Sequence, residues 1–276
     1  MRNYKLITDS SANPAVAALG AASVPLKVLL GIHEYVDTPD LDTALLLEDM
    51  KHYRGTSSSA CPAVQDFLDA FGGADEIFVA TISSGVSGCY NAAAIAANMY
   101  MADNSGKKVF VLDSLTTGPE LQLIMEKLRQ LVDTDLSFEE ICREIRTYRK
   151  HTHLLFSLES LENLAKNGRC SMVEAKAAGI LGIRVVGRAS AEGTLEPLHK
   201  CRGEKKALQQ LYTSMKEAGF RGSKVRIAHT YNPRAAVQLT ALIHEEFPGC
   251  DVEIVRTGGL CAFYSESGGL LLGFEG

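Results

Sequence analysis

One loop of the sequence combines the groups that hold a small anion. Residues 83–91 read SSGVSGCYN and lie between the apolar run EIFVATI and the alanine-rich segment CYNAAAIAANM. A strand that ends in such a loop and continues as a helix brings hydroxyls and backbone N–H groups to the helix N-terminus, where the helix dipole favours an anion. Ser84 and Ser87 would supply hydroxyls, and Gly85 and Gly88 would let the backbone approach closely. We expect an anion site here; a glycine-rich turn capped by serines is the simpler alternative.

Catalytic motifs are scarce around this loop. A hydrolase nucleophile elbow reads GxSxG, whereas the stretch centred on Ser87 reads GVSGC and lacks the final glycine. The sequence has no P-loop lysine motif and no HExxH zinc motif. The histidines of HTH, His151 and His153, follow two basic residues and are typical of a solvated polar face rather than of metal ligands. We predict no catalytic residue, no cofactor and no metal site, with covalent catalysis by Ser87 left open.

Three more hydroxyl-rich segments could form one polar rim with this loop. Two of them, Thr8–Pro14 (TDSSANP) and Asp113–Pro119 (DSLTTGP), directly follow apolar runs that read as strands. Open α/β sheets bind ligands outside the carboxyl ends of their strands. The third segment, Gly55–Pro62 (GTSSSACP), could close over the same edge. Each segment alone is more simply explained as turn chemistry, because Asp, Ser and Asn satisfy their own backbone in loops.

The elements that must position these loops follow an alternating pattern. Short apolar runs bounded by turn residues alternate with segments of helical period, which predicts strands buried on both faces of a sheet. In the first half, strands are expected at Tyr4–Thr8, Val24–Leu29, Glu76–Ile82 and Lys108–Leu112, and helices at Leu41–Tyr53, Gly88–Met101, Pro119–Val132 and Ser137–Lys150. We expect a mostly parallel, layered α/β lobe. Ser137, with Glu140 three residues later, has the form of a capping box and predicts the start of the last helix.

In the second half of the sequence, strands and helices alternate less regularly, and the pattern predicts a mixed sheet. Strands are expected at Leu154–Ser157, Ile183–Gly187, Leu195–Cys201, Lys224–Ala228 and Val252–Arg256, and helices at Leu158–Lys166, Met172–Leu181 and Glu204–Ala218. The turn-like ASAEG joins two of these strands as a hairpin. Asn232 and Pro233 have the form of an N-cap and first residue of a further helix, and the chain ends in a glycine-rich stretch. The predicted fold is α/β with two lobes, residues 1–152 and 153–276.

The composition narrows the function classes. The chain has 276 residues, 28 basic against 33 acidic side chains and a net charge of -5, without a basic stripe that could neutralise nucleic-acid phosphates. Arg202, Lys205 and Lys206 are read as the solvated start of a helix. The seven cysteines form no CxxC pair, and neither a signal-peptide pattern nor a run of about 18 apolar residues occurs. We expect a soluble cytoplasmic protein with reduced thiols that does not bind nucleic acid.

Taken in order, several stretches resemble the DegV family of two-domain lipid-binding proteins, which includes the fatty-acid-binding subunit of bacterial fatty acid kinase. ITDSSANP, VPLKVLL and EYVD resemble its first strands and turns, and TISSGVSGCYNAA resembles its ISSxLSGTYxSA loop. LENLAKNGRCS, the following GILGIRVVGRASAEGTLEPLHKCRGEKKAL and IAHTYNP resemble its second lobe. The resemblance covers nearly the whole chain. It implies one long-chain fatty acid, such as palmitate, in a tunnel between the lobes.

The resemblance also implies which residues hold the carboxylate. A hydroxyl of the family's TSxP segment matches Ser59, and the serine of its LSG loop matches Ser87. A register shift of one residue would put Ser58 in place of Ser59, because alanine and cysteine precede the proline here. Ser84 and Gly88 belong to the same loop as Ser87 and are included in the expected site.

Other matched positions extend or modify this site. Arg169 in NGRCS matches the family's arginine in GGRIS and would face the head group or a partner. Tyr264 stands where the family has a histidine, so it can donate a hydrogen bond but carries no positive charge near pH 7. Glu120 stands near the implied tunnel, where the family has small residues. Candidate lining residues are Leu164, Met172, Ile180 and Phe263.

Three hypotheses follow for the function. The first is a non-enzymatic carrier that presents the carboxylate of its fatty acid to a separate kinase subunit, whose product is an acyl phosphate, and that contacts membrane surfaces transiently. The second is an enzyme or phosphate-ligand binder that uses the Ser87 loop, as an acyl hydrolase or for a phosphorylated metabolite. The third is a family member that has lost lipid binding, suggested by Tyr264 and Glu120.

Overall fold

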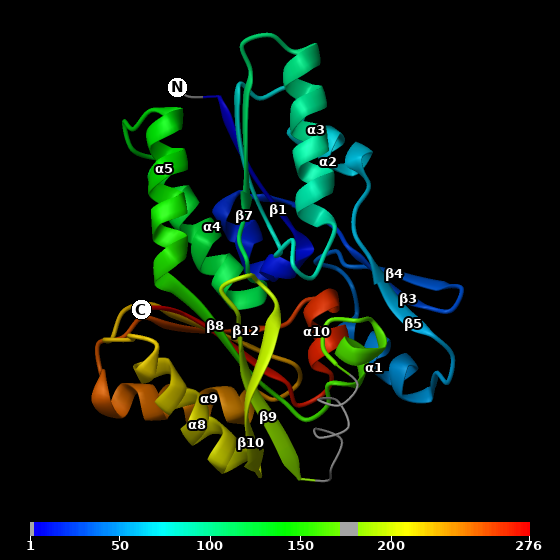
Figure 1. The fold of residues 1–276 in the computed structure, drawn as a ribbon, viewed down its shortest axis with the longest axis vertical. Coiled ribbons are helices and arrows are strands. Elements are labelled where there is room, and N and C mark those ends of the chain that lie inside the picture. The colour runs from blue at the N-terminus through cyan, green and yellow to red at the C-terminus, as the bar shows by residue number, and fades with distance from the viewer. Residues whose placement is uncertain (1–2, 172–181) are drawn as a thin grey trace.

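Three β-sheets with helices packed against them make up residues 3–171 and 182–276, the part of the chain that the computed structural model describes (Figure 1). The first, here called the parallel sheet, has the strand order β2-β1-β6-β7, and all neighbouring strands in it run parallel. Its strands are β1 (Tyr4–Asp9), β2 (Ala22–Val24), β6 (Glu76–Thr81) and β7 (Lys108–Asp113). The parallel arrangement predicted for the first half is confirmed.

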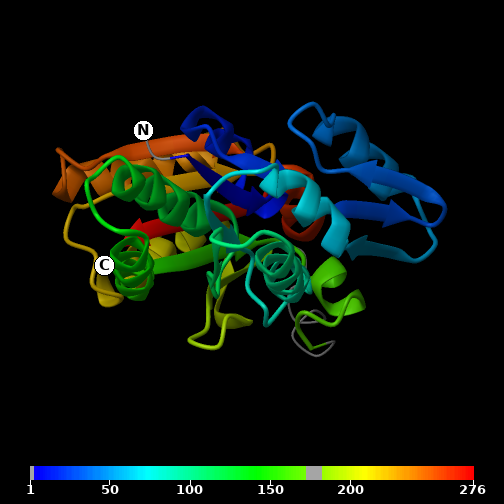
Figure 2. The same cartoon turned by 90° about the horizontal axis from the view of Figure 1, so that it is seen from above.

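Helices cover both faces of the parallel sheet (Figures 1 and 2). They are α2 (Val64–Phe71), α3 (Cys89–Asp103), α4 (Gly118–Val132) and α5 (Phe138–Tyr148). Ile7 and Val79 belong to the apolar cluster on the side of α2 and α3, whereas Leu6 and Phe78 belong to the cluster on the side of α4 and α5. Successive strand residues point to opposite faces. Strands covered on both sides therefore read as continuous apolar runs, as the sequence predicted.

The second half forms a six-stranded mixed sheet with the order β10-β9-β8-β13-β11-β12. Its strands are β8 (Thr152–Leu158), β9 (Ile183–Ala189), β10 (Leu195–Arg202), β11 (Val225–His229), β12 (Val252–Arg256) and β13 (Leu270–Glu275). β9 and β10 pair antiparallel, which confirms the predicted hairpin. The mixed character of the sheet is also confirmed, since β11 and β12 run parallel. The division into lobes at residue 152 stays a prediction.

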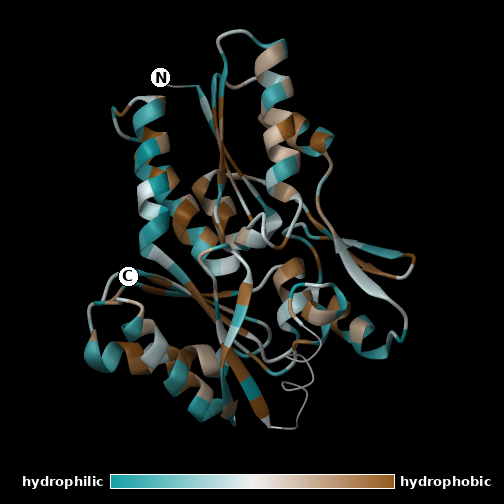
Figure 3. Cartoon of the chain, viewed as in Figure 1, coloured by the Kyte–Doolittle hydropathy of each residue, from teal (hydrophilic) through white to brown (hydrophobic). Residues whose placement is uncertain are grey.

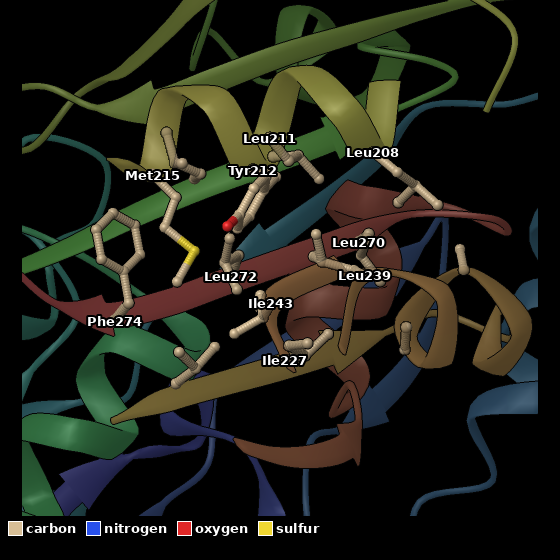
Figure 4. Packing of buried hydrophobic residues seen from close by; sticks show 14 of the residues in the cluster. Leu208, Leu211, Tyr212, Met215, Ile227, Leu239, Ile243, Leu270, Leu272 and Phe274 are labelled. Carbon is tan, nitrogen blue, oxygen red and sulfur yellow. The ribbon is translucent and has the colours of Figure 1, made fainter. Parts of the chain in front are cut away.

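Two helices cover one face of the mixed sheet (Figure 4). They are α8 (Glu204–Glu217) and α9 (Pro233–Glu246). Leu211 and Met215 of α8 and Ile243 of α9 point toward Ile227 and Leu272 of the sheet, and all of them are buried. The alternate residues of these strands point to the opposite face of the sheet, which α8 and α9 do not cover.

A small antiparallel sheet with the order β4-β3-β5 extends to one side of the molecule (Figure 1). It consists of β3 (Lys27–Leu30), β4 (His33–Val36) and β5 (Ser57–Ala60), and α1 (Thr43–His52) and α10 (Gly259–Ser265) pack beside it. The single strand predicted at Val24–Leu29 is wrong. Pro25 separates β2 from β3, because proline fixes its backbone angle φ and has no N–H for a strand ladder. The chain then leaves the parallel sheet.

Two predicted helix starts are confirmed by their caps. Ser137 accepts a hydrogen bond from Glu140 N at 3.3 Å, and the Glu140 carboxylate accepts one from Ser137 N at 2.8 Å. Asn232 Oδ1 accepts one from Ala235 N at 3.2 Å ahead of α9. Short 3₁₀ helices lie at Ser10–Ala12, Pro14–Leu19 and Arg149–His151.

Other local predictions need correction. The helix expected at Leu158–Lys166 is only α6 (Glu162–Lys166), because β8 continues to Leu158. The serine-rich Gly55–Pro62 segment, for which no strand was predicted, contains β5. The glycine-rich end contains α10 and β13, of which β13 lies between β8 and β11. The helix predicted at Met172–Leu181 lies outside the described residues.

Hydropathy along the ribbon agrees with this layered packing. In Figure 3 the strands carry long hydrophobic stretches, whereas helices such as α5 combine hydrophilic and hydrophobic residues. Each such helix places its apolar side on a sheet and its polar side toward solvent. Among the described residues, no helix combines the length and the apolar character needed to cross a membrane.

Candidate functional site

A cavity lies on the face of the mixed sheet opposite the one that α8 and α9 cover. Leu154, Phe156 and Leu158 alternate along β8, share one face of the sheet and line this cavity. The loops after β6 and β7, the strand β5 and the helix α10 contribute the other walls. The space between the lining atoms is about 760 Å³, including open solvent at its mouth, but the centre of a water molecule fits in only about 70 Å³ of it. The cavity is therefore narrow and suits a slender ligand.

Hydroxyl groups from three separate elements lie on this wall. Ser59 of β5 and Tyr264 of α10 both line the cavity, and Ser59 Oγ and Tyr264 OH share a hydrogen bond of 2.7 Å. Ser87, from the loop before α3, lines the same cavity. A serine or tyrosine hydroxyl can donate one hydrogen bond to an anion without itself being charged. The structure thus brings together three residues that the sequence predicted as a site.

Arg169 is the one cationic side chain among the described residues that line the cavity. Its Nε donates to Val86 O at 3.1 Å, its Nη1 donates to Asn167 O, and its guanidinium carbon lies 5.8 Å from the centre of the Tyr264 ring. These contacts fix the guanidinium group between the loop before α3 and the segment after α6. The hydroxyl-lined part of the cavity therefore has one positive charge beside it.

Backbone amides of the loop before α3 are bonded within the protein. Ser84 N donates to Asp113 Oδ1 at 3.0 Å, Ser87 N donates to Ser83 O at 3.1 Å, and Cys89 N donates to Ser87 Oγ at 3.3 Å. The sequence suggested that amides at this helix start would hold an anion. These three amides already have partners within the protein, so they are not available to a ligand.

Three other predicted residues lie outside the cavity wall. Ser58 alternates with Ser59 along β5 and does not line the cavity. The Ser84 hydroxyl donates to Asp113 Oδ2 at 2.5 Å on the exposed side of the loop. Gly88 is the N-cap of α3, where an added Cβ would lie 3.1 Å from Cys61 Sγ. The geometry thus selects Ser59 over Ser58.

Only part of the predicted apolar lining is found on the cavity wall. Leu164 lines the cavity, but Phe263 is fully buried and packs with Val28, Leu30 and Leu46 instead. Consecutive residues of α10 point in different directions, so Tyr264 faces the cavity while Phe263 enters the core. Met172 and Ile180 lie outside the described residues.

Sequence reasoning missed most of the apolar wall. It includes the β8 residues named above together with Leu195 of β10, Leu260 of α10 and Leu271 of β13. β8 is buried along nearly its whole length, so its sequence could not show which face lines a cavity and which packs against helices.

Two buried aspartates, also missed, hold parts of the site in place. Asp37 accepts hydrogen bonds from Gly259 N at 2.6 Å and Leu260 N at 2.9 Å and so fixes the start of α10, which carries Tyr264. Asp9 accepts one from Ile82 N at 2.6 Å, just before the serine loop. Burial raises the pKa of Asp9 to about 6 and also raises the pKa of Asp37. The hydroxyl wall therefore depends on buried carboxylates behind it.

Known proteins resemble this chain over its whole length. The model of the DegV family, described as an uncharacterised protein family, matches residues 3–274. The chain belongs to the DegV family. A DegV domain-containing protein of Streptococcus pneumoniae is 42% identical over 278 residues, covering 99% of both chains. This finding confirms the family resemblance inferred from the sequence.

Two solved DegV structures share the fold closely. The S. pneumoniae fatty acid kinase (Fak) B3 protein, loaded with linoleic acid, is 41% identical with a TM-score of 0.94, covering 100% of this chain and 99% of that one. A DegV family protein from Eubacterium eligens, loaded with heptadecanoic acid, is 40% identical with a TM-score of 0.93, covering 99% of both chains. The fold predicted as two packed α/β parts agrees with these DegV structures.

Two further side chains considered from the sequence, Glu120 and His153, line a second cavity of this DegV chain. Leu154 lines both this cavity and the first one. Glu120 is 4% exposed, burial raises its pKa to about 7, and its Oε1 accepts a hydrogen bond of 2.8 Å from Thr152. Burial also lowers the pKa of His153. Within residues 3–171 and 182–276, no cluster of three or more histidine, cysteine, aspartate or glutamate side chains could hold a metal ion.

Proposed function

We propose that this protein binds a long-chain fatty acid, such as palmitate, in the first cavity and carries it without catalysing a reaction. The carboxylate would accept hydrogen bonds from Ser59, Ser87 and Tyr264, with Arg169 beside it. The observation that carries this proposal is that the hydroxyls of Ser59, Ser87 and Tyr264, two of them hydrogen-bonded to each other, line one narrow and largely apolar cavity. Two DegV proteins of about 40% identity hold a fatty acid in their structures, which supports the same ligand class here.

The energetics favour a lipid over a polar metabolite. Burying about 14 methylenes at roughly 0.8 kcal/mol each gives on the order of 11 kcal/mol before the costs of association. Hydrogen bonds from hydroxyls to a carboxylate add less free energy, about 1.5–3 kcal/mol each. The tail would therefore supply most of the affinity, and the hydroxyls would set the orientation of the head group.

The carrier would present the carboxylate to a separate kinase, which would form an acyl phosphate. The similarity to the S. pneumoniae fatty acid kinase B3 protein supports this partner class. Transient contact with a membrane surface would let the protein collect its ligand. All seven cysteines are free thiols, in keeping with the reducing cytoplasm.

Hydrolysis by Ser87 has less support. A serine nucleophile needs a general base within hydrogen-bond reach. The Ser87 hydroxyl accepts from Cys89 N at 3.3 Å and donates to Cys89 Sγ at 3.2 Å, and burial raises the pKa of that thiol, which makes it a poor partner for proton transfer. Phosphate binding by the loop amides has less support, because the amides of Ser84, Ser87 and Cys89 are already bonded within the protein.

The proposal is tested by titrating delipidated protein with palmitate and with its methyl ester. The methyl ester keeps the tail but lacks the carboxylate, so it should bind more weakly by at least about tenfold. Ser59→Ala should weaken palmitate binding but leave methyl ester binding nearly unchanged, and Ser58→Ala, on the other face of the same strand, should change neither. Equal affinities for acid and ester would contradict the assigned head-group site. A kinase catalytic subunit with ATP should then convert bound palmitate to acyl phosphate.

A further inference from the structure

The first cavity has two ends that differ in chemistry. β8 leads from Leu158 directly toward α6, and the Asn163 side chain of α6 lies 3.5 Å from the hydroxyl of Ser57, two residues before Ser59. Leu158 therefore marks the hydroxyl end. Leu154 lies four residues earlier on the same strand, roughly 13 Å away at 3.3 Å per residue. A ligand whose carboxylate lies at Ser59 would reach Leu154 with the distal part of its chain.

Beyond that far end lies the second cavity, which contains charged and polar side chains. Leu154 and Ala189 line both cavities and form the wall between them. On the other side of this wall stand Glu120, Thr152 and Arg149. The second cavity is also wider, since the centre of a water molecule fits in about 500 Å³ of it. A plain alkyl end that entered this space would lose the gain from burial.

The polar groups of this cavity leave hydrogen-bonding capacity unused. Glu120 is buried and accepts a hydrogen bond of 2.8 Å from Thr152, and its carboxyl also interacts with Thr116 and Arg149. Arg149 Nε is buried and has no hydrogen-bond partner within the described part of the chain. Buried glutamates are rare unless they are paired, and an unpaired buried donor is costly. Glu120 and Arg149 both line the second cavity, so an acceptor group and a donor group lie beside the end of the proposed acyl site.

We propose that the preferred fatty acid carries a hydroxyl group on the distal half of its chain, and that Glu120 and Arg149 bind this hydroxyl where the two cavities adjoin, at Leu154 and Ala189. A hydroxyl both donates and accepts, so it can donate to Glu120 and accept from the guanidinium group of Arg149 at once. A second carboxylate could only accept and would lie against Glu120. This inference rests on the proposed fatty acid function and names the class of acyl chain.

The test is a competition among three acids of equal chain length for the delipidated full-length protein. They are octadecanoic acid, 12-hydroxyoctadecanoic acid and 2-hydroxyoctadecanoic acid, and the bound fraction is quantified by mass spectrometry after gel filtration. The 12-hydroxy acid should bind at least about threefold more tightly than octadecanoic acid. The 2-hydroxy isomer, which has the same composition but places its hydroxyl beside the carboxylate, should show no such gain.

Variants of Glu120 test whether this residue causes the preference for the 12-hydroxy acid. Glu120→Leu should abolish the preference for the 12-hydroxy acid while octadecanoic acid still binds, and Glu144→Leu, on the exposed side of α5, should keep it. Glu120→Gln, which retains hydrogen-bonding groups of similar shape, should preserve most of the preference and serves if the leucine variant fails to fold. Equal binding of octadecanoic and 12-hydroxyoctadecanoic acid overturns the inference but leaves the proposed function standing. Binding of none of the three acids overturns both.

Discussion

Ser59 and Tyr264 lie 205 positions apart in the chain, yet their side-chain oxygens share a hydrogen bond of 2.7 Å on the cavity wall. The bond joins a strand of the small sheet to the helix α10. It holds two hydroxyls side by side at the proposed carboxylate position. Several predictions about affinity depend on this pair.

Tyr264→Phe removes one hydroxyl of the pair and keeps the aromatic ring. The affinity for palmitate should fall by about tenfold or more, because a hydrogen bond to a charged group contributes about 1.5–3 kcal/mol. Isothermal titration of delipidated protein measures this change. An unchanged dissociation constant would remove Tyr264 from the head-group site.

Tyr264→His should make the binding depend on pH. A tyrosine stays neutral up to a pH of about 10, whereas a histidine gains a positive charge below about 6.5. The variant should therefore bind palmitate more tightly at pH 5.5 than at pH 8, relative to the wild-type protein titrated at the same two values. A ratio between the two proteins that does not vary with pH would place residue 264 away from the carboxylate.

Ser87→Ala tests the loop that the sequence singled out. Palmitate affinity should fall by about tenfold or more, since the hydroxyl is a proposed donor. Ser84→Ala is the matched control in the same loop: it loses the hydrogen bond to Asp113 and some stability, but should keep its affinity. The assignment fails if Ser84→Ala weakens binding as strongly as Ser87→Ala.

Glu120→Gln should change how stability varies with pH. The folded-state pKa of Glu120, about 7, lies above its ordinary value of 4.5, so the folded protein binds this proton more tightly than the unfolded chain does. Stability from this group is therefore present at low pH and is lost as pH rises from about 4.5 to about 7. Between pH 6 and pH 8 the wild-type protein should lose about 1 kcal/mol relative to the variant.

Urea unfolding of both proteins at the two pH values measures this difference. Histidines and Asp9 titrate in both proteins, so their contributions cancel in the comparison. Parallel stability curves for the two proteins would show that Glu120 is ionised without penalty.

Asp37→Asn should destabilise the protein through α10. The carboxylate accepts from two backbone amides, at Gly259 and Leu260, whereas an asparagine has one acceptor oxygen and an NH₂ group that meets donors. A loss of about 1–3 kcal/mol in unfolding free energy is expected. Asp103→Asn, at the exposed end of α3, is the control and should cost less than about 0.5 kcal/mol. Equal losses of unfolding free energy in the two variants would contradict the role of Asp37 in fixing the start of α10.

Local signals in the sequence predicted much of the fold. The caps at Ser137 and Asn232 act within four residues, so their side chains identify helix starts directly. β13 was missed because its place between β8 and β11 depends on pairing with segments far away in the chain. Pro25 was overlooked as the break between β2 and β3, although its missing N–H offered a signal.

The candidate site was predictable where the family resemblance supplied it. Ser59, Ser87 and Tyr264 came from matched motifs, and the structure places all three on one wall. The choice between Ser58 and Ser59 needed the pairing of β5 with β3, which fixes the face that each side chain occupies. Phe263 and Tyr264 are neighbours in sequence, and only the packing of α10 separates core from cavity.

Mass spectrometry of the lipid extracted from the purified protein tests the central claim most directly. Protein expressed in a bacterial host should release about one long-chain fatty acid per chain, and Ser59→Ala combined with Ser87→Ala should release much less. Protein that carries no acyl chain after purification, and takes up none when fatty acid is added, would contradict the account.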